Sequence, residues 1–361
     1  MRVFQLLFAV FLLTAASARG DPLEEPLQHE FLLMPSAVVF GTFDRQAPVT
    51  EVVDQVIQAD MLVSLQKGPF KLFSEYLLSD HEGDLERFQL GWQASDETVI
   101  WLGRYHQPTS VWNHDHHHGQ YLSTSISRPA LDEWEDLGGI LPQHFTGMLI
   151  ESSKHAYGDW SLRTALGGGI APHIIPDGLD PFDLVHPSSR HRQVGYQARA
   201  SLHPGELTDT GFGILAASDE LPVVGLAAPP IVGLDHVDLK LFGAFGMYAA
   251  SDWKVLATAY HVYTRLSSPT TSTHDSFDIG YLEIERRFAR DFTAFARWED
   301  SSHASDAQYL KLFPAFFRAK HLGGVRWDFI QNQALTVQFA DSHTLAGRFS
   351  DISLQWSAAF F

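Results

Sequence analysis

The chain has 361 residues, no cysteine, 12% aromatic residues and a formal net charge of −18 at pH 7. The acidic balance disfavours a nucleic-acid partner, because binding to nucleic acid needs clustered Lys and Arg to displace counterions. A long chain without cysteine is consistent with an oxidising compartment, where a stray thiol would be a hazard.

The N-terminus has the pattern of a cleaved signal peptide. Arg2 gives a positive start, residues 3–13 are apolar, and residues 16–18 (Ala-Ser-Ala) form a small-residue cleavage site. The apolar stretch is about half of the ~20 residues that a spanning helix needs, so a membrane anchor is disfavoured. We therefore expect a signal peptide over 1–18 and a short periplasmic lead-in over 19–35.

The rest of the chain shows strand after strand with period-two alternation, the pattern of extended segments with two different faces. In one segment the apolar Val99, Trp101 and Tyr105 occupy one face, which we expect to meet lipid. Arg104 and His106 occupy the other face. The expected strands are 36–43, 61–67, 70–79, 85–94, 99–106, 145–153, 159–167, 193–203, 210–218, 236–250, 253–265, 276–288, 292–301, 320–330, 333–341 and 349–361.

The connections between these strands alternate in length. Short turns such as 251–252 and 331–332 separate longer connections such as 168–190 and 219–235. Membrane barrels have short periplasmic turns on one side and longer external loops on the other. A soluble all-β protein shows similar strand alternation but has no need of this regular change in loop length. We therefore predict an all-β fold, an antiparallel transmembrane β-barrel of about 16 strands over 36–361.

The strand count, short turns, signal sequence and terminal Phe361 resemble Gram-negative outer-membrane porins, although Phe360 rather than Phe361 is in phase with the apolar face. Three motifs resemble uncharacterised porin-like proteins related to the phosphate-selective porins: GRYHQP (103–108), SISRP (125–129) and LGGILP (137–142). The resemblance implies a channel in the outer membrane, in contact with its lipid. Such a channel passes small hydrophilic solutes or ions by diffusion, is often a homotrimer, and is narrowed by an inward-folded loop.

The longest external connection, 108–144, is the predicted inward-folded loop. It carries an acidic run, and strand alternation directs several arginines into the lumen. A basic wall opposite an acidic loop would create a transverse field at a constriction, which orients dipolar solutes and sets ion preference. The predicted constriction residues are Arg87, Arg104, Arg163, Arg199, Arg297, Arg326, Asp132, Glu133, Glu135 and Asp136.

The alternative is that these charges only solvate the lumen and the loop surface. Four acids that alternation also directs inward weaken any purely anion-selective prediction. They are Asp238, Glu299, Asp328 and Asp351.

A histidine-rich tract inside the loop is a candidate metal site. It comprises His114, Asp115, His116, His117 and His118, and three of its imidazoles could bind Zn²⁺ or Cu²⁺ in an extended or a helical segment. The alternative is a polar loop whose imidazoles titrate near neutral pH. No cofactor is required for a channel, so outer-membrane metal binding or uptake is a second candidate function.

An enzyme is not expected. Ser123, Ser125 and Ser127 lie near His118, but the sequence has no nucleophile elbow and no fixed spacing of a catalytic triad. The glycines at 167–169 end a strand with no helix after them, so they do not form a nucleotide-binding motif. A third candidate function is a closed structural barrel that sheaths or docks a partner protein.

Overall fold

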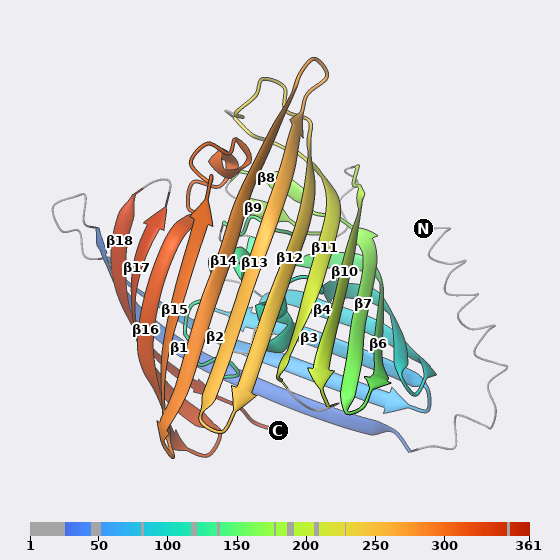
Figure 1. Ribbon diagram of the computed structural model, residues 1–361, viewed down its shortest axis with the longest axis vertical. Coiled ribbons are helices and arrows are strands. Elements are labelled where there is room, and N and C mark those ends of the chain that lie inside the picture. The colour runs from blue at the N-terminus through green and yellow to red at the C-terminus, as the bar shows by residue number, and fades with distance from the viewer. Residues whose placement is uncertain are drawn as a thin grey trace.

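The computed structural model describes residues 26–44, 52–80, 83–116, 121–135, 138–176, 178–185, 191–205, 209–227, 229–344 and 347–361. Sixteen antiparallel strands close into one barrel, in the order β1-β18-β17-β16-β15-β14-β13-β12-β11-β10-β7-β6-β5-β4-β3-β2 (Figure 1). The predicted all-β barrel is therefore confirmed. The predicted signal peptide and the first part of the lead-in, residues 19–25, lie outside the described residues.

The wall strands are β1 (Gln28–Asp44), β2 (Val52–Lys67), β3 (Phe70–Ser79), β4 (Gly83–Ser95), β5 (Thr98–His106), β6 (His144–Tyr157), β7 (Trp160–Ile170), β10 (Val194–Pro204), β11 (Gly211–Pro222), β12 (His236–Ala250), β13 (Trp253–Ser267), β14 (Ser272–Ala289), β15 (Phe292–Ser302), β16 (Phe317–Ile330), β17 (Gln333–Thr344) and β18 (Arg348–Ala358). The connections contain the helical segments α2 (Val111–His116), η2 (Ala130–Asp132) and η4 (Tyr309–Leu312), and a small sheet of β8 (His173–Ile175) and β9 (Gly178–Asp180). Within the described residues, the helices are too short or too polar to span a membrane.

Two strands begin earlier than their sequence pattern predicts. β1 starts at Gln28 instead of 36, and β2 at Val52 instead of 61, so the end of the predicted lead-in belongs to the wall. The early part of β1 is the unbroken apolar run 31–34, which has no period of two. Met34 packs there against Leu62 of β2, both buried, and this contact replaces the alternation as the reason for strand formation.

The outer face of the barrel is apolar along most strands. Val337 pairs with Leu354 on the neighbouring strand, and both side chains are about half exposed. The alternate residues Thr336 and Gln338 are buried inside the barrel. Lipid selects this inverted arrangement, because a hydrocarbon solvent favours apolar groups outside and leaves polar groups to the lumen.

Aromatic side chains collect at the short-turn end of the barrel. Phe292 stacks on Trp327 with ring centroids 5.7 Å apart, and Trp253 and Trp160 are also exposed near their turns. Such side chains are favoured at the boundary between lipid and water, where one part of the ring contacts hydrocarbon and another part contacts water.

The long-loop ends of β12 to β14 reverse the pattern. There Val237 and Leu239 point inward and are buried, while Asp238 forms an ion pair with Arg265 on the outer surface, 2.6 Å apart. The prediction that Asp238 faces the lumen was therefore wrong. The hairpin of β13 and β14 extends beyond its neighbours on this side (Figure 1).

Apolar packing inside this half of the barrel explains the reversal. The side chains of η4 and its neighbours fill the space between the strands and form one buried cluster with the 107–143 connection. Members of the cluster include Val237, Leu239, Val262, Phe277, Tyr309, Leu310, Phe313, Ile140 and Leu141. The inner face of the wall is therefore apolar where loops pack on it and polar nearer the short turns.

A charged residue on the lipid face should destabilise the barrel. We expect Val337→Arg, near the middle of β17, to lower the free energy of unfolding by about 2–4 kcal/mol, because a guanidinium at mid-depth must leave water. Urea unfolding in lipid vesicles measures the change. Val232→Arg, at a loop position that is 91% exposed, is the matched control and should have little effect. Equal effects of the two substitutions would contradict the assignment of the lipid face.

Candidate functional site: the loop docked across the lumen

The connection between β5 and β6 crosses the barrel. β5 stands eight places from β15 in the sixteen-strand ring, so the two strands lie on opposite sides. The loop nevertheless forms hydrogen bonds with β14, β15, β16 and β17. The predicted inward fold of this loop is thus observed.

Three wall side chains anchor the far side of the loop. Arg297 on β15, Arg326 on β16 and Gln338 on β17 each make two or more hydrogen bonds to the segment 121–127. These bonds are Arg297 Nη1 to Ser125 Oγ (3.0 Å), Arg297 Nη2 to Ser127 O (2.8 Å), Arg326 Nη1 to Tyr121 O and Ser123 O (2.7 Å each), Ile126 N to Gln338 Oε1 (2.9 Å) and Gln338 Nε2 to Ser127 Oγ (2.7 Å). The backbone of this segment is therefore fixed to the wall by side chains rather than by strand pairing.

The loop also has a polar core of its own. Asn113 donates to Gln143 Oε1 (2.7 Å) and accepts from Arg128 Nη1 (2.7 Å). The Arg128 guanidinium lies 3.4 Å from the ring centroid of Trp134. Burial lowers the pKa of Arg128 to about 10, opposed by nearby carboxylates. This network joins the beginning of the loop, at Asn113, to its end, at Gln143, on the β5 and β6 side of the barrel.

Asp132 is the most buried of the loop acids whose side chains the structure describes, with 1% of its surface exposed. Its carboxylate accepts a hydrogen bond from Ser110 Oγ. Burial raises the pKa of Asp132 to about 7, although the Ser110 hydrogen bond and the charge of Arg128 oppose the shift. The carboxyl group therefore changes charge near neutral pH.

Four of the six predicted constriction arginines are paired with acids of the barrel wall. Arg87 binds Glu75, and Arg104 lies 3.3 Å from Asp84. Arg297 contacts Glu283 and Glu299 at 2.8 Å each, and Arg326 contacts Asp328 at 2.9 Å. The wall charges are thus arranged as local pairs.

The predicted loop acids have partners within or near the loop. Asp132 accepts from Ser110, and Glu135 lies 2.7 Å from His144 Nδ1. Glu133 accepts from the backbone N–H of Trp134. Asp136 lies outside the described residues. The transverse field between a basic wall and an acidic loop remains a prediction.

The phase predicted for β5 is reversed. Val99 lines a lumen cavity, Trp101 donates to Glu151 of β6, and Tyr105 donates to Gln197 of β10. These residues face the interior instead of lipid, and Tyr105 joins the buried apolar cluster that also contains loop residues. Arg104 lies on the other side of the strand and is also buried, so the tip of β5 is covered by protein on both faces.

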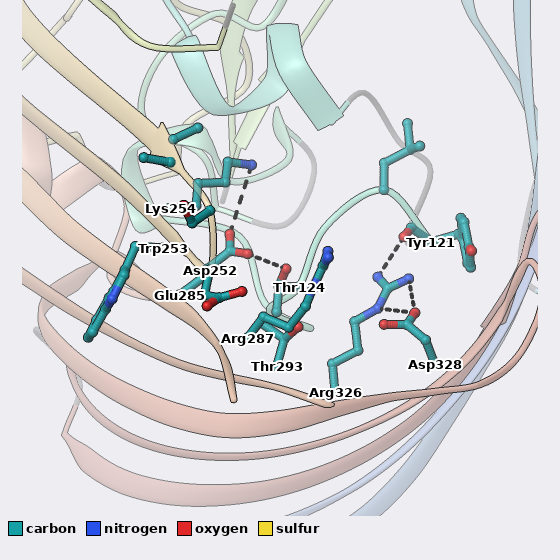
Figure 2. Close-up of a pocket in the computed structure, with 14 residues that line it drawn as sticks. Tyr121, Thr124, Asp252, Trp253, Lys254, Glu285, Arg287, Thr293, Arg326 and Asp328 are labelled. Carbon is teal, nitrogen blue, oxygen red and sulfur yellow. Dashed lines mark hydrogen bonds and ion pairs between the residues drawn. The ribbon is translucent and has the colours of Figure 1, made fainter. Parts of the chain in front are cut away.

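Two cavities lie on the short-turn side of the docked loop. The first, of about 680 Å³, is lined by three basic and three acidic side chains (Figure 2). They are Lys254, Arg287, Arg326, Asp252, Glu285 and Asp328. The second, of about 410 Å³, is again lined by three of each, Lys71, Arg163, Arg199, Asp96, Glu97 and Glu151. Neither cavity is dominated by one sign of charge.

The described histidines of the metal-candidate tract point to different places. His114 lies 3.9 Å from Glu151 and lines the second cavity. His116 Nδ1 donates to Trp112 O (3.0 Å), and His116 Nε2 lies 3.4 Å from Nζ of Lys254, which lines the first cavity. The side chain of Asp115 and residues 117–118 lie outside the described residues. Metal binding by this tract stays a prediction.

The sequence analysis missed Gln338 and the wall carboxylate Glu283. Both could have been found from alternation, because Gln338 follows Val337 and Glu283 lies between Leu282 and Ile284. Polar residues between outward apolar ones face the lumen, whatever their charge.

No family model and no curated protein matches this sequence. The structure is similar to solved outer-membrane proteins. OmpT of Vibrio cholerae shares 10% identity at a TM-score of 0.57, with 95% of this chain and 99% of that chain covered. The anion-selective porin of Comamonas acidovorans shares 11% at 0.58, covering 93% and 100%. The outer membrane channel DcaP of Acinetobacter baumannii shares 8% at 0.55, covering 95% and 100%. At these identities the likeness shows a shared porin-type barrel fold.

Removing Arg297 should destabilise the folded barrel strongly. Arg297→Met leaves Glu283 and Glu299 buried without their cation and the loop without two donors, so we expect a loss of about 3–5 kcal/mol in denaturant unfolding. Arg348→Met is the matched control, because Arg348 pairs with Asp341 at an exposed position. A similar midpoint shift for both variants would contradict a central role for Arg297.

Asp132 should make loop docking sensitive to pH. Its folded pKa of about 7 lies above the ~3.9 of an exposed Asp, so the folded state holds the proton more tightly. The sign follows: the contribution of Asp132 to stability is fully present below about pH 4 and is lost as pH rises through 7, a change of up to about 4 kcal/mol. Asp132→Asn should flatten this decline in thermal unfolding midpoints between pH 5 and 8. Parallel pH profiles of wild type and variant would count against the assignment.

Proposed function

We propose that the protein is an outer-membrane diffusion channel for small hydrophilic solutes, and that the docked loop limits passage. The observation that carries the proposal is the loop anchored across the lumen by Arg297, Arg326 and Gln338. A barrel that served only as a scaffold would not need a polar lumen divided by an anchored loop. The similarity to solved porins supports the same proposal.

Weak charge selectivity is part of the proposal. Each lumen cavity balances three basic side chains against three acidic ones, so a single ion passing through meets no net field of one sign. Paired charges instead suit dipolar or neutral polar solutes, which can turn to meet both signs. Phosphate selectivity, which the sequence resemblance raises, would need a surplus of cationic groups along the path.

The proposal also covers the membrane in which the channel lies and its oligomeric state. The apolar outer face and the aromatic belt fit the outer membrane of a Gram-negative bacterium. A homotrimer is included in the proposal because a trimer form of the similar Vibrio cholerae protein OmpT has been solved.

Planar-bilayer recording tests the channel. We expect the folded protein to conduct, with a reversal potential near zero in a KCl gradient because the cavity charges are balanced. Releasing the loop with the double substitution Arg326→Ala and Gln338→Ala should raise the single-channel conductance. Arg265→Ala, on the outer surface, should leave it unchanged. Folded barrels that stay silent in both wild type and the double variant would exclude a channel.

A further inference from the structure

Three buried side chains near the base of the loop form a possible ligand set outside the lumen cavities. Glu86 of β4, His106 at the end of β5 and His144 at the start of β6 each offer one ligand atom, and these atoms lie within 4.8 Å of one another. Their exposed fractions are 4%, 9% and 5%. The three residues belong to three neighbouring strands, so the barrel itself holds them together.

The strand register explains why they meet. His106 and His144 are direct cross-strand partners on β5 and β6. The antiparallel β4–β5 ladder pairs Phe88 with Arg104. Two residues earlier on β4 is Glu86, and two residues later on β5 is His106, so these two side chains lie opposite each other. Glu86 is also the extra residue of a β-bulge, since Arg87 pairs with β3 at 75 and the next pair uses residue 85. Bulges redirect side chains, and here the bulge turns Glu86 toward the two imidazoles.

A fourth residue, Glu135 of the loop, orients one imidazole. Glu135 Oε2 lies 2.7 Å from His144 Nδ1, which leaves His144 Nε2 facing Glu86 Oε2 at 3.0 Å. Glu135 is itself fixed, because its other oxygen accepts from the backbone N–H groups of Gln143 (2.7 Å) and His144 (3.3 Å). Metal-binding histidines commonly give their second nitrogen to such a carboxylate.

Charges of both signs surround the cluster. Glu86 and Glu135 place two carboxylates around His144. Arg104 is shared between Asp84 (3.3 Å) and Glu86 (3.9 Å), so it balances one of them. The carboxylates of Glu86 and Glu135 are buried, and a buried ionised carboxylate is costly unless a cation or hydrogen bonds compensate it.

We propose that Glu86, His106 and His144 bind a first-row divalent cation of the Zn²⁺ class, with Glu135 orienting His144. Two imidazoles and one carboxylate suit such ions, and a fourth position stays open for water. The ion would tie both ends of the loop to β4 and so stiffen the loop that crosses the lumen. A protonated His144 between the two carboxylates is the competing arrangement.

The experiment uses a tract variant as host, in which His114→Ala, His116→Ala, His117→Ala and His118→Ala remove adventitious binding. We expect this folded variant, in detergent, to bind one Zn²⁺ per chain by calorimetry. Co²⁺ should give the visible absorption bands of a nitrogen- and oxygen-ligated site. Adding Glu86→Gln or His106→Gln should abolish both signals, and Glu135→Gln should weaken binding by about 10–100-fold.

Circular dichroism identifies variants that fail to fold, and the wild-type Co²⁺ spectrum needs no substitution at all. A folded tract variant that binds neither ion would overturn the proposal in favour of the protonated His144. Binding that survives Glu86→Gln and His106→Gln would overturn it as well. Because binding is measured without conductance, its failure is separate from failure of the proposed channel.

Discussion

The arrangement of the lumen depends on satisfying buried polar groups. A segment that crosses the barrel carries backbone N–H and C=O groups, and burying them without partners costs free energy. Arg297 and Arg326 meet the carbonyl oxygens of the segment, and Gln338 meets its N–H groups. Each arginine keeps a wall carboxylate as its second partner. The same side chains therefore neutralise the wall and hold the loop.

Two kinds of contact hold the loop, and they act on opposite sides of it. On the long-loop side, Ile140 and Leu141 join the apolar cluster built by η4 and the reversed faces of β12 to β14. Near the short turns the contacts are hydrogen bonds to charged side chains. Apolar packing is non-directional, whereas hydrogen bonds set position and angle. The cluster therefore holds the loop inside the barrel, and the arginines determine where it lies.

The sequence predicted the fold best where lipid touches one face of a strand. On β17 and β18 the outward residues Val337 and Leu354 are apolar and their neighbours polar, so alternation located both faces correctly. On β5 and the upper part of β12 the inner face packs against loops and is itself apolar, so the same rule placed Trp101 and Asp238 on the wrong side. Alternation of apolar and polar residues shows that the two faces of a strand have different environments. Where protein covers the inner face, the pattern does not indicate which face points to the lumen.

The candidate site divides in the same way between what register determines and what it does not. Glu283 lies directly opposite Arg297 on the β14–β15 hairpin, and this register is set locally by the short turn at 290–291 together with the β-bulge between Arg287 and Ala289. The pairing of His106 with His144 spans a long loop, and no local pattern gives its register. The histidine tract is conspicuous in composition, yet of its described members His114 lines one cavity and His116 contacts Lys254 of the other. The ligands of a metal site on a barrel come from neighbouring strands. Where a long loop joins two strands, their pairing is known only from the three-dimensional structure.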